Sequence, residues 1–118
     1  MTLRRGDLVM TRIPHASGNR GKKRPAVIIQ ADVYNLQVKH FVVAEVTGNV
    51  NAATDPASFL IDTSTPDGKA TGLDKSSVVC CLFLATIGEG TITSVIGKLS
   101  SAMLAQLDAC VKTALQLA

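Results

Sequence analysis

The sequence changes character once, within residues 20–31, RGKKRPAVIIQA. Up to Arg24 this stretch is a cationic loop, and after Pro25 it is an uninterrupted apolar run rich in β-branched residues. Such a run predicts a strand buried on both faces, over residues 25–31. Pro25 has no N–H for a sheet ladder, so we expect it at the first residue of this strand. Arg24 is then expected at the rim of the core, facing solvent, where a guanidinium suits a phosphate.

Composition bounds the class of protein. The chain has 118 residues, 47% of them hydrophobic, which predicts one domain over residues 1–118 with a modest core. No apolar run is long enough to span a bilayer, and the first residues lack the apolar segment of a signal peptide. Three cysteines, two of them adjacent, make a poor disulfide framework, so a cytoplasmic location is expected. Aromatic residues amount to 3%, which is little for base stacking.

The net charge of +3 conceals an asymmetry along the chain. Residues 1–40 contain eight Lys and Arg against two Asp, which gives +6, whereas the remainder contains four basic and seven acidic residues, which gives −3. A basic segment on a mildly acidic body predicts a surface that faces a polyanion. A solvated charged loop is the plainer alternative, and charge alone does not separate the two.

Hydrophobic patterning predicts short strands followed by one helix. The expected strands cover residues 8–13, 25–31, 38–46, 57–61, 77–84 and 91–98, with connections at 14–23, 32–35 and 62–72. From Met103 onward the apolar residues recur every three or four positions, which predicts an amphipathic helix over 101–117, with Ser100 or Ser101 as its N-cap. The fold class is therefore mainly β with a C-terminal α-helix, as a small barrel or curled sheet.

The residues that most often carry catalysis or bind metals form no recognisable constellation. Cys80, Cys81 and Cys110 lie in apolar segments without a second cysteine pair or a nearby histidine, so they are interpreted as small buried hydrophobic residues. His15 and His40 have no matching Cys, Ser or carboxylate. The sequence has no phosphate-binding loop and no dinucleotide fingerprint, and we predict neither a metal nor a cofactor.

Several motifs follow one another in a fixed order: RGDLV near the N-terminus, KKRPAVII, VVAEVT, GLDKSSVV, then TI, IGKLS and a terminal helix. This ordered set resembles the MazF/PemK toxins, the ribonuclease components of toxin–antitoxin pairs. The resemblance covers residues 5–117. It implies an SH3-like barrel with a C-terminal helix, usually a homodimer, that cleaves single-stranded RNA at short sequences without a metal. It also implies an antitoxin partner whose disordered acidic segment occupies the RNA groove.

The resemblance also implies roles for particular residues. The family's functional arginine, in the Arg-Pro that opens the second strand, falls on Arg24, and its functional threonine, at the end of the third strand, falls on Thr47. The loop that contacts RNA in the family falls on residues 17–23, which makes the candidate RNA-binding residues Ser17, Asn19, Arg20, Lys22 and Lys23. Without the resemblance, Thr47 is simply a strand-ending residue in a Thr-Gly-Asn turn.

The sequence departs from the family pattern at the fifth strand. Where the family often has polar residues, an acid or Gln and then Arg, this chain has CCLFLA before Thr86. The chemistry still fits RNA cleavage by its own 2′-OH, because Arg24 and Thr47 can donate to the negative charge that grows on the phosphorane. Neither is a general base at neutral pH, so the base is unidentified. The alternatives are a non-catalytic relative that binds RNA or antitoxin, and a plain interaction domain with a solvated basic loop.

Overall fold

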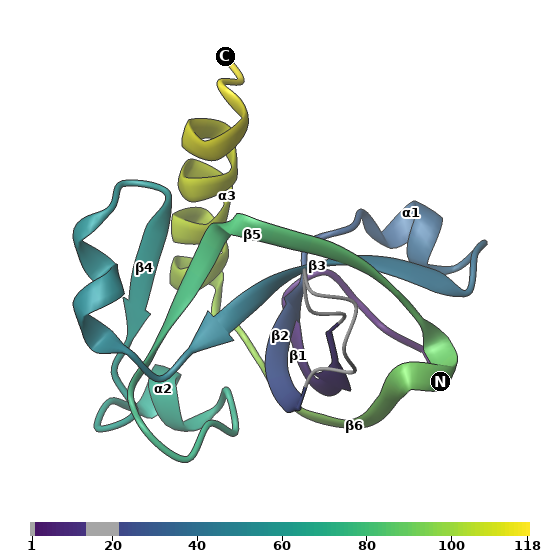
Figure 1. Ribbon diagram of the computed structural model, residues 1–118, viewed down its shortest axis with the longest axis horizontal. Helices are drawn as coiled ribbons and strands as arrows, with labels where there is room; N and C mark the ends of the chain where they lie inside the picture. Colours follow the sequence, from purple (N-terminus) through teal and green to yellow (C-terminus); the bar gives the residue numbers. More distant parts are fainter. Residues whose placement is uncertain (1, 14–21) are drawn as a thin grey trace.

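The computed structural model describes residues 2–13 and 22–118. In this part of the chain six strands form one antiparallel sheet in the order β4-β5-β3-β2-β1-β6. The strands are β1 (Asp7–Arg12), β2 (Lys23–Ile28), β3 (His40–Thr47), β4 (Ser58–Ile61), β5 (Ser77–Gly88) and β6 (Ile92–Lys98). The sheet curls into an open barrel, and α3 (Ser101–Leu115) stands against one side of it (Figure 1). The prediction of a mainly β, barrel-like fold with a C-terminal helix is confirmed.

The sheet is buried on both faces, and the alternation of side chains along β2 shows why. Val27 belongs to a cluster with Ala44 of β3 and with Leu107 of α3. Ala26 and Ile28 belong to a second cluster on the other face. Successive side chains of a strand point to opposite faces, so a continuous apolar run supplies both clusters. The prediction that the second strand is buried on both faces is therefore confirmed.

The predicted limits of the second strand, 25–31, are wrong at both ends. The strand begins at Lys23 and ends at Ile28, and Pro25 lies inside it opposite Met10 of β1. On its other side, β2 pairs with β3 only from Ala26 onward. At Pro25 the strand therefore has a partner on one side only, the position in a sheet where a residue without an N–H is tolerated.

The C-terminal helix is set by its caps and by the core beneath it. The Ser100 hydroxyl accepts a hydrogen bond from the N–H of Met103 at 3.2 Å, which confirms the predicted N-cap. The helix ends at Leu115, not at the expected residue 117, because Gln116 adopts a left-handed conformation with φ 56°. No helix within residues 2–13 and 22–118 is long and apolar enough to cross a membrane.

An ion pair ties this helix to the N-terminal segment. The Arg5 guanidinium lies 2.7 Å from the Asp108 carboxylate of α3 and also donates to the carbonyl of Ile29 at 2.9 Å. The N–H of Arg5 donates to the Asp32 carboxylate at 2.6 Å. One arginine thus links α3 to the end of β2 and to the short helix that follows it.

The connections between the strands contain short helices that the sequence did not predict. They are α1 (Asp32–Asn35), η1 (Val50–Thr54), α2 (Pro66–Lys69) and η2 (Glu89–Thr91). The other strands differ from their predicted limits by one or two residues, except the fifth, which continues to Gly88 where an end at residue 84 was expected. The pairing of β5 with β3 is interrupted by a bulge in β5. Glu45 of β3 pairs with Cys80, whereas the preceding residue, Ala44, pairs with Leu84.

Candidate functional site

A cavity of about 480 Å³ opens where the first residues of β2 meet the end of β3. Four cationic side chains line it, from Lys22, Lys23, Arg24 and Lys75, together with one carboxylate, from Asp74. The rest of the lining is mostly apolar or glycine and comprises Met10, Pro25, Val46, Gly48, Gly72, Leu73, Ser77 and Ile96. A cationic rim over an apolar floor is suited to a ligand that carries both phosphates and flat apolar groups.

Arg24 is exposed and stands on a rigid strand, as the sequence predicted. It pairs with Thr11 of β1, which is fully buried and whose hydroxyl lies 3.1 Å from the carbonyl of Thr91. The side chain of Arg24 therefore begins at a fixed point of the backbone and reaches solvent at the rim of the cavity. When the guanidinium binds an oxyanion, only the side-chain torsions of Arg24 remain to be ordered, because its backbone is already fixed.

Thr47 ends β3, also as predicted, but it is not among the residues that line the cavity. The pairing of β2 with β3 ends at Ala26 opposite Glu45, two residues before the positions of Arg24 and Thr47. Side chains two residues apart along a strand share a face, so the two predicted catalytic residues lie on one face of the sheet, beyond the last paired residues. The Thr47 hydroxyl accepts a hydrogen bond from the N–H of Asn49 at 3.2 Å, which leaves its proton available for another acceptor.

The predicted RNA-binding residues divide into two groups. Lys22 and Lys23 are exposed and line the cavity with Arg24, so the structure brings these three cations together. Ser17, Asn19 and Arg20 lie outside the described residues, as does His15.

Lys75 is a cavity residue that the sequence interpretation missed. It belongs to the GLDKSSVV motif, and the only signal that could have drawn attention to it is a cation directly before a buried strand. A methyl group added to Gly48 would lie 2.6 Å from Lys75 Cε and 2.9 Å from its Nζ. The ammonium of Lys75 therefore rests on the turn that immediately follows Thr47, next to one predicted catalytic residue and in the same cavity as the other.

The cations of the cavity are not neutralised by neighbouring carboxylates. The ion pair of Arg5 with Asp108 lies at α3 and not at the cavity, and no carboxylate of the described residues forms an ion pair with Lys22, Lys23, Arg24 or Lys75. Unpaired cations gathered in one concave site raise the local concentration of anions and favour their binding. Asp74 is the single acidic group of the lining.

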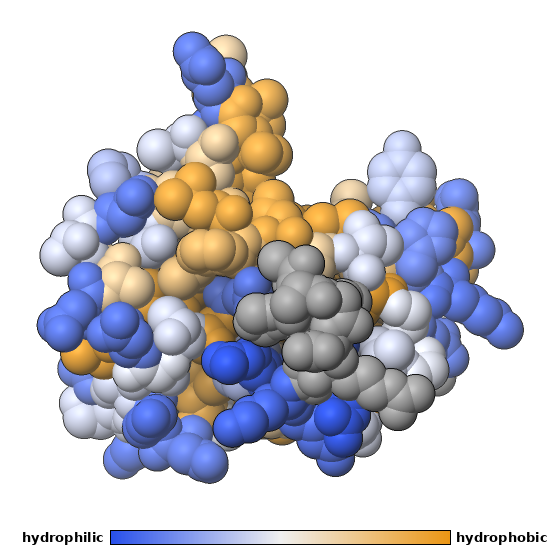
Figure 2. Space-filling model, viewed as in Figure 1, coloured by the Kyte–Doolittle hydropathy of each residue, from blue (hydrophilic) through white to orange (hydrophobic). Residues whose placement is uncertain are grey.

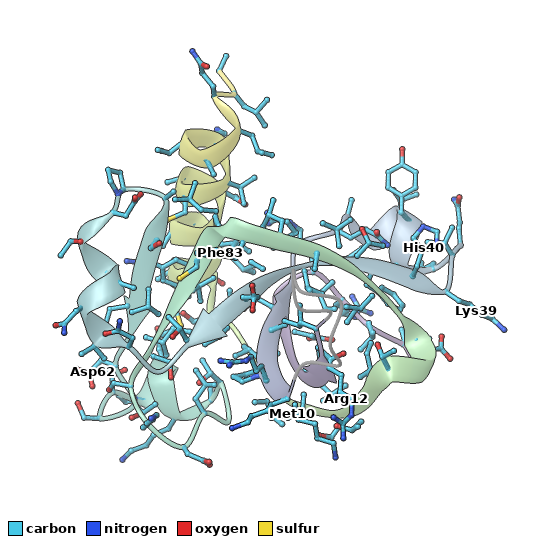
Figure 3. All side chains as sticks on the ribbon, in the orientation of Figure 1. Met10, Arg12, Lys39, His40, Asp62 and Phe83 are labelled. Atoms are coloured by element: carbon cyan, nitrogen blue, oxygen red, sulfur yellow. The ribbon has the colours of Figure 1, made fainter. Side chains whose placement is uncertain are left out.

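His40 does not join this site. It is exposed at the first residue of β3, where it pairs with Gly88, and it lies beside α1 at the end of the sheet away from Met10, a residue of the cavity (Figure 3).

The three cysteines are buried, as expected for residues interpreted as small buried hydrophobic side chains. Cys80, Cys81 and Cys110 are free thiols, and none is more than 6% exposed. Burial raises the pKa of all three thiols, that of Cys81 to about 12, so they remain protonated at neutral pH. Among the described residues no three His, Cys, Asp or Glu side chains lie close enough together to hold a metal ion.

An apolar face adjoins the cationic one. The bulge in β5 turns Leu82 and Phe83 outward, and they are 57% and 60% exposed. Phe83 lies at the bend of β5 beside α3, whose last turn and following residues expose Leu115 and Leu117 (Figure 3). Figure 2 shows hydrophobic surface over β5 and α3 and hydrophilic residues gathered over the ends of β1 and β2, on the same side of the molecule. We call Leu82, Phe83, Leu115 and Leu117 the β5–α3 face.

Fold and site together define a class, that of small antiparallel β-barrel proteins with a cation-lined cavity suited to phosphates. The sequence matches, over residues 4–115, the family described as PemK-like, MazF-like toxin of type II toxin-antitoxin system. This match spans nearly the whole chain, so the chain belongs to that family. The resemblance drawn from the sequence motifs is confirmed.

Solved structures show the same fold. An endoribonuclease in complex with its cognate antitoxin, from a mycobacterial species, is 17% identical with a TM-score of 0.77, over 98% of this chain and 97% of that one. The Mycobacterium tuberculosis toxin MazF-mt6 is 23% identical with a TM-score of 0.71, over 92% and 98%. A MazE-MazF structure from Deinococcus radiodurans is 17% identical with a TM-score of 0.73, over 100% and 99%.

Proposed function

We propose that this toxin is an endoribonuclease that cleaves single-stranded RNA in the cytoplasm at short sequences. Family membership supports this proposal, as do similar structures described as endoribonucleases. The observation that carries it is the cavity, in which four cations surround an apolar floor without an ion-paired carboxylate among the described residues. Phosphates meet the cations, and the apolar floor offers van der Waals contact to a base without aromatic stacking.

In this proposal the RNA supplies its own nucleophile. The 2′-oxygen attacks the adjacent phosphorus, the bond from phosphorus to the 5′-oxygen breaks, and the products carry a 2′,3′-cyclic phosphate and a 5′-hydroxyl. The proton of the 2′-OH passes to water, and the leaving 5′-oxygen takes up a proton from water. Hydrolysis of the cyclic ester then gives a 3′-phosphate. The step consumes no cofactor and needs no metal ion.

Arg24 and Thr47 have distinct roles in this reaction. Negative charge grows on the non-bridging oxygens as the phosphorane forms, and donors aimed at that charge lower the barrier more than donors aimed at the ground state. The Arg24 guanidinium supplies two such donors in a fixed fork, and the Thr47 hydroxyl supplies a third. Both positions are fixed by strands, so the donors need little rearrangement during the reaction.

The partner that we propose is a cognate antitoxin with a disordered acidic segment. Two of the similar structures are named as complexes of a toxin or endoribonuclease with its antitoxin. A cationic groove that binds phosphates also attracts carboxylates, so an acidic peptide with apolar anchors can compete with RNA for the same cavity. Such competition is the simplest physical route by which an antitoxin neutralises the toxin.

We also propose a two-fold homodimer that buries the β5–α3 face. Its four large apolar side chains are each more than half exposed. A contiguous apolar face on a chain of this size indicates an association surface, because burying it against an identical face removes both from water. In the family the homologous stretch of the fifth strand often carries polar residues, so its apolar character here favours a role in assembly over one in catalysis.

The experiment that tests the proposed function is incubation of mixed-sequence RNA with the purified protein in excess EDTA. We expect cleavage at a short preferred sequence, with 2′,3′-cyclic phosphate or 3′-phosphate and 5′-hydroxyl ends, and no inhibition by the chelator. Binding without any cleavage would instead support the alternative, a non-catalytic relative that binds RNA or antitoxin. Absence of salt-dependent RNA binding would contradict the proposed function and also a relative that binds RNA.

A further inference from the structure

Lys75 lies in the cavity although it is distant in sequence from the other cations there, Lys22, Lys23 and Arg24. It belongs to the connection between α2 and β5, and its side chain lies over Gly48. Lys22, Lys23 and Arg24 enter the cavity from the start of β2, whereas Lys75 enters from this separate connection. The cavity therefore has cations from two independent parts of the chain.

The connection that carries Lys75 is held in place by the rest of the fold. Gly72 has φ +76°, and a side chain on it would meet the carbonyl of Ile96 in β6. The Ser76 hydroxyl accepts from the N–H of Thr63 at 3.1 Å, and the Ser77 hydroxyl donates to the carbonyl of Lys75 itself at 2.8 Å. The backbone of Lys75 is thus fixed on both sides, although its side chain is exposed.

We propose that Lys75 is a substrate-positioning residue, whose ammonium binds a phosphate of the RNA next to the one that reacts at Arg24. This inference rests on the proposed function. No carboxylate of the described residues lies within ion-pair distance of Lys75, so its charge is available to a ligand. Lys75 covers the turn after Thr47 and lines the same cavity as Arg24, so a strand whose reacting phosphate sits at Arg24 has a second cation close by for a neighbouring phosphate. Lysine binds phosphate as a compact point charge with three donors, which suits a phosphate that has to be held but not transformed.

The role has a kinetic signature that differs from that of Arg24. A phosphate that does not react carries the same charge in the ground state and in the transition state, so its contact with Lys75 contributes equally to both. Loss of Lys75 should therefore raise KM and leave kcat within about twofold, whereas loss of a donor to the developing charge lowers kcat. It should also reduce the salt dependence of RNA binding, because one fewer phosphate is neutralised.

The first test compares Lys75→Met with Lys75→Arg and with Lys112→Met, which removes an exposed lysine from α3 outside the cavity. For Lys75→Met we expect about tenfold weaker RNA binding. The slope of the logarithm of affinity against the logarithm of salt concentration should fall by about 0.7. Lys75→Arg should restore most of the affinity, and Lys112→Met should match wild type in both quantities.

The second test moves the ammonium without removing its charge. In Gly48→Ala the added methyl group meets only the flexible end of Lys75 among nearby atoms, so the fold is retained while the ammonium is displaced. We expect a loss of affinity close to that of Lys75→Met, and no further loss in the double variant, because both changes remove one contact.

Three outcomes would overturn the proposal. The first is a Lys75→Met protein with wild-type KM and salt slope. The second is an equal effect of Lys112→Met, since the contribution would then be general charge. The third is full additivity of Gly48→Ala with Lys75→Met. These outcomes concern Lys75 alone and leave a cleaving wild type intact. A wild type that neither binds nor cuts RNA would overturn the proposed function itself.

Discussion

The exposed Phe83 allows a quantitative prediction about assembly. The side chain stands on the bulge of β5, beside α3 (Figure 3). If the β5–α3 face is a homodimer interface, then Phe83→Ala removes an apolar anchor from both copies at once. The variant should dissociate more readily than wild type while each protomer keeps its fold, because an exposed side chain contributes little to the stability of the protomer.

The expected size of the effect follows from the exposed area. A phenylalanine presents on the order of 200 Å² of surface, and Phe83 is 60% exposed, so roughly 120 Å² of it faces solvent. If half of that area is covered in the dimer, its burial contributes about 1.5 kcal/mol at ~25 cal/mol per Å². Two-fold symmetry doubles this to about 3 kcal/mol, which corresponds to an increase of about a hundredfold in the dimer dissociation constant.

Sedimentation velocity over a dilution series measures that constant directly. The matched control is Leu36→Ala, because Leu36 follows α1, is 75% exposed and lies outside the β5–α3 face. We expect the control to associate as wild type does. A wild type that is monomeric at micromolar concentration, or a Phe83→Ala protein that dimerises like wild type, would refute the assignment of this face. If only the Leu36→Ala control dimerises more weakly than wild type, the interface lies at α1 instead.

Three further predictions concern the site and the core. Arg24→Ala should lower kcat for RNA cleavage by about a hundredfold and Thr47→Ala by less, with unchanged circular dichroism; an Arg24→Ala protein that cleaves at the wild-type rate would remove Arg24 from the site. Substitution of Lys22 and Lys23 by Glu should weaken binding of RNA and of antitoxin together, measured by titration of each, and a change in only one would contradict a shared cavity. The raised pKa of Cys81, about 12, predicts that the free energy of unfolding in urea falls between about pH 9 and pH 12, since the unfolded thiol ionises first; Cys81→Ala should lack this part of the decline.

Features that depend only on neighbouring residues could be predicted from the sequence. The rim position of Arg24 follows from one boundary between charged and apolar residues, and the N-cap at Ser100 follows from a change of period next to a serine. The limits of β2 were not predictable in this way. Whether proline is tolerated inside a strand depends on which neighbours that strand has at that point, and the neighbours of Pro25 are set by the order of strands in the whole sheet.

The place of Lys75 in the site could not be predicted from the sequence, because it too depends on the whole fold. Lys75 and Arg24 come to one cavity through the fold of the connections, and no spacing in the sequence records that approach. The exposure of the β5–α3 face could not be predicted either. Leu82 and Phe83 belong to a run that is apolar throughout, and such a run predicts buried residues. Only the bulge opposite Glu45 turns them outward, and a continuous apolar run carries no mark of a bulge.

The pairing of β1 with β6 has a consequence for how the chain is made. Asp7 lies opposite Lys98, so the outer edge of β1 has no partner until β6 has been synthesised. The cluster around Val27 and Ala44 remains open for longer still, until Leu107 of α3 arrives. Contacts of such long sequence separation slow folding. A nascent chain of this design therefore keeps apolar surface exposed to other proteins until α3 has been synthesised.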